Sequence, residues 1–136
     1  MRPETRARAR ALQALYAWDV RGGERLEHVA SQVWDDLAVT ADERRIAGPL
    51  IRDIAKVGAE IDAELADVTT NWRLERLGVV ERSVLRLGAA ELRRNVAPPR
   101  VVIQEAVRLA ERFGSPQSAR FVNGVLDALA RRMGRL

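Results

Sequence analysis

The side chains best suited to chemistry are arginines near the N-terminus. Arg2, Arg6 and Arg10 recur every four residues. On a helix they lie within about 80° of one another, and Gln13 adds an amide to the same stripe. A guanidinium can bind a phosphate through two parallel hydrogen bonds. Because cations at a helix N-terminus oppose the helix dipole, stability alone does not explain the stripe. The pattern favours a bound anion over an ordinary solvated helix start.

Arg8 differs from its neighbours because it points toward the apolar side of the same predicted helix. That side carries Ala11, Leu12, Leu15 and Trp18. An unpaired buried guanidinium is costly. We therefore expect Arg8 either to extend to water along the apolar surface or to meet a carboxylate.

A second feature lies close to the C-terminus, where an apolar segment contains Phe121, Asn123 and Gly124. Glycine inside a helix costs about 1 kcal/mol relative to alanine, so Gly124 predicts a close backbone approach. The ring of Phe121 and the amide of Asn123 predict a polar and stacking surface at the same place. Alone, these residues favour a helix crossing with a solvated asparagine. The distant arginine stripe favours a nucleic-acid surface instead.

Composition limits the class of protein. The chain has 136 residues, no cysteine and a net charge of +4, and Lys56 is the only lysine among 23 basic residues. A chain of this length predicts a single domain with a sizeable core. Without cysteine there are no disulfides, thiolate metal sites or cysteine nucleophiles. No apolar run predicts a membrane span or signal peptide, so we expect a cytoplasmic protein.

Catalytic motifs are not found in this sequence. His28 is the only histidine and has no second metal ligand near it in sequence. No serine lies in a nucleophile elbow, and no glycine-rich phosphate loop or dinucleotide fingerprint occurs. Four carboxylates have arginines nearby, which favours ion pairs over acid–base chemistry; they are Glu75, Glu81, Glu91 and Glu105. The sequence therefore predicts no enzyme, no metal site and no cofactor.

The apolar periodicity is helical throughout, with no alternating strand pattern. It predicts about seven helices, over residues 3–20, 26–37, 40–67, 72–77, 79–94 and 100–113 and from 116 onward. Thr40 and Glu43 form a capping-box pattern, and Ser115 is a predicted cap for the last helix. Gly48-Pro49 predicts a kink in the long third helix. A loop at residues 69–71 is the only plausible boundary between two halves, about 1–70 and 71–136.

Four short motifs are spread along nearly the whole chain. They are ALQALYAW at residues 11–18, ERSVLRL at 81–87, VIQEAV at 102–107 and FVNGVLD at 121–127. In their order and spacing they resemble the NusB family of transcription antitermination factors. The resemblance implies an all-α fold, a NusB-like bundle in which two three-helix halves pack at a steep angle within a single domain, residues 1–136.

The resemblance also implies a function. Proteins of this family bind the single-stranded boxA element of ribosomal RNA leaders together with NusE, a small-subunit ribosomal protein. With RNA polymerase and other Nus factors, they promote read-through of terminators. No bond is made or broken in this activity, so the expected partners are RNA and proteins rather than a small-molecule substrate.

Site residues follow from the same resemblance. The implied RNA-binding residues are Arg6, Arg8, Arg10 and Gln13 in the first helix and Ser118, Arg120, Phe121 and Asn123 in the last. The implied contacts with the protein partner are Tyr16, Glu75 and Glu81. The departures from the usual family pattern are Glu4, Ala9, Gln104 and Gln117. A basic track with aromatic stacking and edge hydrogen bonds suits single-stranded RNA.

Two other classes of protein stay open. Some ribosomal RNA cytosine methyltransferases carry a NusB-like N-terminal domain that positions RNA, which would make this chain part of a longer protein. The other alternative is a helical interaction module without RNA binding, such as a homodimer that buries the first helix. Neither alternative places catalytic residues in this chain.

Overall fold

The computed structural model describes residues 2–69 and 74–136, apart from the side chain of Glu75, and all regular structure in this part of the chain is helical. It contains six α-helices and one 3-10 helix: α1 (Pro3–Arg21), α2 (Leu26–Asp36), α3 (Ala41–Val68), η1 (Leu74–Arg76), α4 (Val79–Arg94), α5 (Pro99–Phe113) and α6 (Pro116–Arg132). The predicted all-α class is confirmed. The short helix expected around residues 72–77 is the 3-10 turn η1, and Trp72 lies outside the described residues.

Local signals set the helix ends close to their predicted places. Thr40 Oγ1 accepts the backbone N–H of Glu43 at 3.2 Å, and Ser115 Oγ accepts the backbone N–H of Ser118 at 3.1 Å. Each hydroxyl thus satisfies one of the N–H groups that a helix start leaves without an intrahelical partner. After α1, Gly22 adopts φ of +67°, a backbone conformation that favours glycine. These caps explain why the predicted helix boundaries were accurate.

The kink in α3 lies at Val57 and not at Gly48-Pro49. Val57 has φ −118° and ψ 25°, outside the helical region, whereas Pro49 lies within the helix. The prediction of the kink site was therefore wrong. α3 packs on α1 and α2 and also on α4 and α6, so the bend lets one helix follow both groups. The bend thus lies beside Gly58, a weak helix breaker, and not at the proline.

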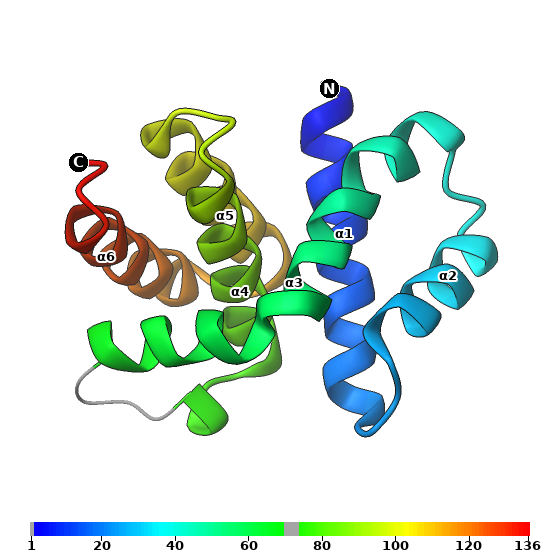
Figure 1. Ribbon diagram of the computed structural model, residues 1–136, viewed down its shortest axis with the longest axis horizontal. Helices are drawn as coiled ribbons and strands as arrows, with labels where there is room; N and C mark the ends of the chain where they lie inside the picture. The colour runs from blue at the N-terminus through cyan, green and yellow to red at the C-terminus, as the bar shows by residue number, and fades with distance from the viewer. Residues whose placement is uncertain (1, 70–73) are drawn as a thin grey trace.

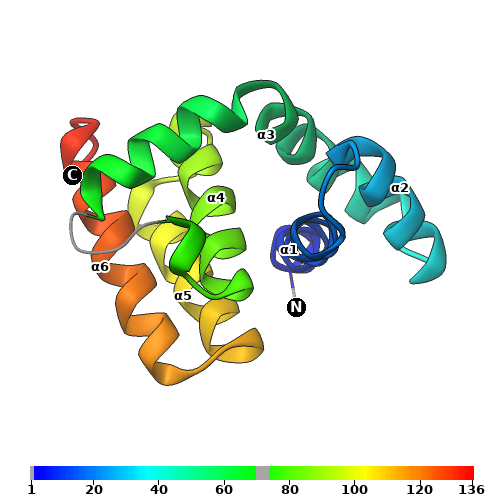
Figure 2. The same ribbon diagram turned by 90° about the horizontal axis from the view of Figure 1, so that it is seen from below.

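α1 lies between α2 and the C-terminal helices, while α4 and α5 separate it from α6 (Figures 1 and 2). The buried apolar side chains form one continuous core to which each of the six α-helices contributes. The fully buried members include Leu15 of α1, Leu65 of α3, Leu85 of α4 and Leu126 of α6. The division of the chain into halves at about residue 70 stays a prediction, since residues 70–73 are outside the described part.

Gly124 does not mark a close approach of two backbones. It is exposed, and a Cβ built there meets nothing within 4 Å. The predicted close-packing role of Gly124 is therefore wrong. The close approach occurs at Gly88 of α4, where a Cβ would lie 2.6 Å from Leu126 Cδ1. Both of these residues are buried in the contact between α4 and α6.

The two glycines should respond oppositely to alanine. Gly88→Ala is expected to lower the free energy of unfolding by about 1–3 kcal/mol through overpacking. Gly124→Ala should raise it by about 0.5–1 kcal/mol, because an exposed helical position gains helix propensity. Urea denaturation of both variants measures the two changes. Shifts of the same sign would contradict this account of the α4–α6 contact.

Asp19 ties α1 to α4 through two arginines. Its carboxylate accepts hydrogen bonds from Arg82 Nε and Nη2, both at 2.7 Å, and from Arg86 Nη1 at 2.9 Å. Arg86 also binds Asp62 of α3 at 2.9 Å and lies over the ring of Trp18, 5.4 Å from its centroid. The hydrogen bonds from Arg82 lower the pKa of Asp19; burial opposes this, and the charges of Arg82 and Arg86 reinforce it.

The lowered pKa of Asp19 makes a testable contribution to acid stability. A carboxyl whose pKa is lower in the folded chain stabilises it fully above the unfolded pKa, roughly 4, and this contribution is lost as pH falls through the folded pKa. Asp19→Asn should therefore lower the free energy of unfolding by about 2 kcal/mol at neutral pH and weaken its decline below pH 4. Urea denaturation across this range measures both effects. Asp127→Asn, which removes one partner of an exposed pair with Arg131, is the control; equal pH dependence in all three proteins would refute the role of Asp19.

Candidate nucleic-acid interface

The exposed side of α1 gathers three of the predicted RNA-binding residues around one carboxylate. Glu43, at the start of α3, binds Arg10 Nε at 2.8 Å and Arg6 Nε at 3.4 Å. Arg10 Nη1 also donates to Gln13 Oε1 at 3.2 Å. The Arg6 side chain is 42% exposed and that of Arg10 is 29% exposed. A guanidinium has five N–H donors, and the solvent-exposed parts of both side chains can be approached by a phosphate. The stripe is thus fixed in orientation while remaining open to solvent.

Arg8 is not part of this exposed stripe. Only 8% of the residue is exposed. Its Nε and Nη2 bind the carboxylate of Glu91 on α4, each at 2.9 Å, and its Nη1 lies 3.3 Å from Glu105 on α5. Thr5 donates a further hydrogen bond to Glu105 at 2.8 Å. Of the two environments predicted for Arg8, the carboxylate partner is confirmed. Both ends of its guanidinium are engaged inside the protein, and its role at the RNA stays a prediction.

Burial alone would lower the pKa of Arg8. The hydrogen bond and charge of Glu91 and the charge of Glu105 outweigh this effect and raise the pKa above its ordinary value. Arg8 therefore stays charged and joins α1 to both α4 and α5. These ion pairs hold the start of α1 against α4 and α5.

Ser118 at the start of α6 is also buried, with 6% of the residue exposed. Its hydroxyl donates to Glu81 Oε1 at 2.7 Å, so a residue predicted to contact RNA instead binds one predicted to contact the protein partner. The hydroxyl of Ser118 is used in this internal contact, and its assignment to the RNA surface stays a prediction. The bond fixes the start of α6 against the start of α4.

Phe121 and Asn123 do not form one surface. Two residues apart on a helix, side chains point about 200° away from each other. Phe121 is half-buried against the core and lines a hollow of about 390 Å³ with Arg76 and Glu81. Asn123 and Arg120 are exposed on α6. The expected shared site is corrected accordingly, because only Phe121 belongs to the hollow.

The three predicted contacts with the protein partner are placed as follows. Tyr16 of α1 is 45% exposed, so its ring can be reached from solvent. Glu81 is half-buried and holds Ser118. The side chain of Glu75 lies outside the described residues, so its predicted role stays a prediction. Tyr16 is thus more accessible than Glu81.

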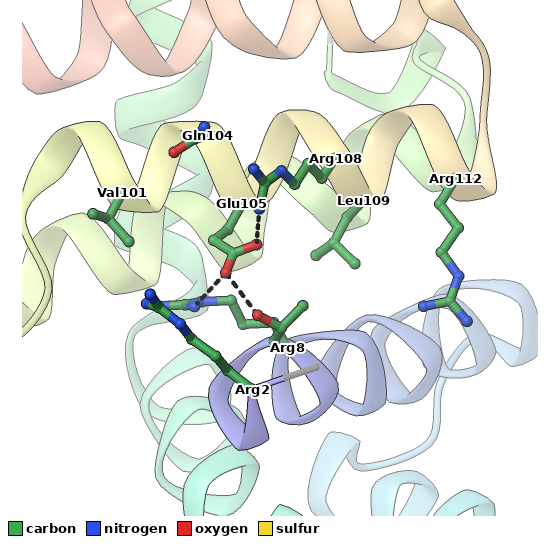
Figure 3. A pocket seen from close by; sticks show the side chains of 9 residues that line it. Arg2, Arg8, Val101, Gln104, Glu105, Arg108, Leu109 and Arg112 are labelled. Atoms are coloured by element: carbon green, nitrogen blue, oxygen red, sulfur yellow. Dashed lines mark hydrogen bonds and ion pairs between the residues drawn. The ribbon is translucent and has the colours of Figure 1, made fainter.

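Sequence reasoning missed two arginines on α5. Arg108 and Arg112 line a groove of about 570 Å³ between the first half of α1 and α5 (Figure 3). Together with Val101 and Gln104 they recur at spacings of three or four residues, which places all four on one face of α5. This spacing was readable in the sequence. The position of α1 opposite that face was not.

No site for metal chemistry is seen in the described residues, where no group of three or more metal-binding side chains occurs. Over the same part of the chain, none of the helices combines the length and apolar character that a membrane span requires. The six α-helices together with the arginines exposed on α1 and α5 are typical of small all-helical proteins that bind nucleic acid.

Comparison with known proteins gives the family. A family model described as the NusB family matches residues 5–131, and the chain belongs to this family. The transcription antitermination protein NusB of Anaeromyxobacter dehalogenans is 44% identical over 127 residues, covering 93% of this chain and 89% of that protein. Its name describes a transcription factor and not an enzyme, as the sequence predicts.

Solved structures agree with this assignment. NusB of T. maritima has a TM-score of 0.85 at 34% identity, with 96% of this chain and 92% of that chain covered. A crystal structure of the antitermination factors NusB and NusE in complex with double-stranded RNA has a TM-score of 0.86 at 32% identity, with 97% of this chain and 98% of that chain covered. The NusB-like all-α fold expected from the sequence is confirmed.

Proposed function

We propose that this protein is a transcription antitermination factor that binds boxA-type single-stranded RNA of ribosomal RNA leaders together with NusE. The observation that carries the proposal is the stripe of Arg6, Arg10 and Gln13 on α1, held in place by Glu43 yet open to solvent, in a member of the NusB family. Its activity is binding, and it promotes read-through by RNA polymerase acting with other Nus factors.

The stripe suits the sugar-phosphate backbone of RNA. Guanidinium groups bind phosphate oxygens in pairs of hydrogen bonds and supply most of the affinity of nucleic-acid complexes. Glu43 orients Arg6 and Arg10 before RNA arrives, so fewer side-chain rotamers remain to be ordered on binding. The exposed Arg120 adds a positive group on a second helix, α6.

Single-stranded RNA suits the ring and amide groups at the interface better than a duplex does. Bases of a single strand can stack on aromatic rings and present their edges for hydrogen bonds, whereas the deep groove of a duplex hides those edges. The rim of the Phe121 hollow and the exposed amide of Asn123 offer both kinds of contact at separate places. The NusB–NusE complex cited above contains double-stranded RNA, so single-stranded and duplex oligonucleotides should be compared directly.

NusE is the proposed protein partner, and its proposed docking surface includes Tyr16 and Glu81. An exposed tyrosine offers apolar area with a polar tip, as protein interfaces often use. Carboxylates at Glu75 and Glu81 would attract a basic ribosomal protein. Because such a factor acts on nascent RNA, we also infer a cytoplasmic location.

Two alternatives are less well supported. The Anaeromyxobacter relative is named as a transcription antitermination protein, which favours that function over a domain of a ribosomal RNA methyltransferase. A homodimer that buries α1 would cover the stripe of Arg6 and Arg10. Binding of RNA at that stripe is therefore incompatible with such a dimer.

The proposal is tested by titrating a short boxA-type single-stranded RNA with the protein alone and with NusE present. We expect binding in both cases and at least tenfold tighter binding with NusE, corresponding to a coupling of about 1.4 kcal/mol. By reciprocity, RNA should tighten the binding of NusE by the same factor. A duplex of the same sequence is the control. Failure to bind RNA with or without NusE would overturn the proposed function.

A further inference from the structure

The groove between α1 and α5 is a candidate binding site, and Arg8 is the only one of the predicted RNA-binding residues among its lining side chains. Figure 3 shows Val101, Leu109 and Arg112 pointing from α5 toward α1, with Arg2 extending from the start of α1 toward α5. The ion pair between Arg8 and Glu105 forms its floor. The volume of about 570 Å³ is in the range of sites that hold a small organic group such as a nucleotide.

The groove carries an excess of positive charge. Four arginines line it, and Glu105 is the only acidic residue among its lining side chains. That carboxylate already binds Arg8 and Thr5, and it lies 3.9 Å from Arg108. Within the described part of the chain, Arg2 and Arg112 have no carboxylate partner, although Arg112 lies over the ring of Phe113. An anion bound in the groove would provide the negative charge that these arginines lack as a partner.

The direction of the groove links the two predicted RNA clusters. The pairs Arg8–Glu91 and Asp19–Arg82 show that α4 runs antiparallel to α1, so the start of α4 lies beside the end of α1. Ser118 binds Glu81, which places the start of α6 at that same end. α5 leads from the start of α1 toward the start of α6. A polyanion that follows the groove therefore passes from the α1 stripe to the Phe121 hollow.

We propose that Arg108 and Arg112 of α5, together with Arg2, hold the sugar-phosphate backbone of single-stranded RNA in this groove. This inference rests on the proposed function and adds the middle segment of its RNA path. Val101, which is 36% exposed, offers an apolar contact to a base, and the exposed amide of Gln104 offers hydrogen bonds to its edge. Each guanidinium can bind one phosphate without disturbing the Arg8 floor.

The test is the salt dependence of affinity for a short boxA-type single-stranded RNA. Each phosphate neutralised contributes about 0.7 to the log–log salt slope for a single strand. Arg108→Gln/Arg112→Gln should therefore reduce the magnitude of the slope by about 1.4 and weaken binding roughly tenfold at physiological salt. The matched control is Arg131→Gln/Arg132→Gln, which removes the same charge from exposed positions at the far end of α6.

The outcomes separate this inference from the proposed function. If the unaltered protein binds RNA and the groove variant matches the control in slope and affinity, the groove inference is overturned while the proposed function stands. If the groove variant binds RNA normally but loses affinity for NusE, the groove is a protein surface and the inference is again overturned. If the unaltered protein does not bind RNA, both fail. Thermal denaturation of each variant verifies that it is folded.

Discussion

Arg8→Ala is expected to lower the free energy of unfolding by about 3–5 kcal/mol, the largest stability effect we predict for a single substitution. The substitution leaves Glu91 and Glu105, with side chains 11% and 10% exposed, without their common cation. Removing one member of a buried charge cluster is costly mainly because the remaining charges stay buried and unpaired. Urea denaturation at neutral pH measures the change.

Two further variants make this prediction specific. Arg45→Ala removes an arginine whose side chain is 72% exposed, and it should change the free energy of unfolding by less than about 0.5 kcal/mol. Arg8→Met/Glu91→Met/Glu105→Gln removes all the charges of the cluster together and should recover most of the lost stability. The amide oxygen that Glu105→Gln introduces can still accept a hydrogen bond from the Thr5 hydroxyl. If Arg8→Ala behaved like Arg45→Ala, the cluster would not be the link between α1, α4 and α5 that we describe.

Neutralising Arg6 and Arg10 together is expected to cost as much RNA affinity as neutralising the two groove arginines. Two phosphate contacts correspond to a reduction of about 1.4 in the log–log salt slope and to roughly tenfold weaker binding at physiological salt. Arg6 and Arg10 both bind Glu43, a residue that is 5% exposed, so removing them alone would leave that carboxylate unpaired. The design therefore includes Glu43→Gln.

The comparison then uses three proteins at matched salt concentrations: the unaltered protein, Arg6→Gln/Arg10→Gln/Glu43→Gln, and Glu43→Gln alone. The single variant should retain the full salt slope because both arginines remain. The triple variant should show the reduced slope at nearly unchanged stability. Equal slopes in all three proteins would exclude these two arginines from the RNA contact.

Much of the fold could be predicted because its signals are local. The caps at Thr40 and Ser115, the glycines after α1, the proline pair after α4 and the proline at the start of α6 predicted the boundaries of the six α-helices to within one residue. The bend in α3 could not be predicted in this way. It depends on how one long helix packs on two groups of neighbours, and the local signal at the bend is Gly58, which directly follows Val57 and is a weaker helix breaker than Pro49.

The candidate site was predicted less completely because its contacts join distant parts of the chain. Helical periodicity predicted that Arg8 either extends to water or meets a carboxylate, but its partners lie 83 and 97 residues away in the sequence. In the same way, a buried position for Ser118 follows from the approach of Glu81, and the close approach of helices lies at Gly88 rather than Gly124. The arginine pair on α5 can be identified as part of a groove only once α1 is known to lie opposite it.

The most direct test of the central claim is the affinity of the unaltered protein for boxA-type single-stranded RNA as a function of salt concentration. Binding by the α1 stripe and the α5 groove predicts a steep dependence, with a log–log slope of about −0.7 for each of several phosphates contacted. Fluorescence anisotropy of labelled RNA, with a duplex of the same sequence beside it, provides the measurement. A slope near zero, or equal affinity for the duplex, would contradict an electrostatic single-stranded RNA site on this protein.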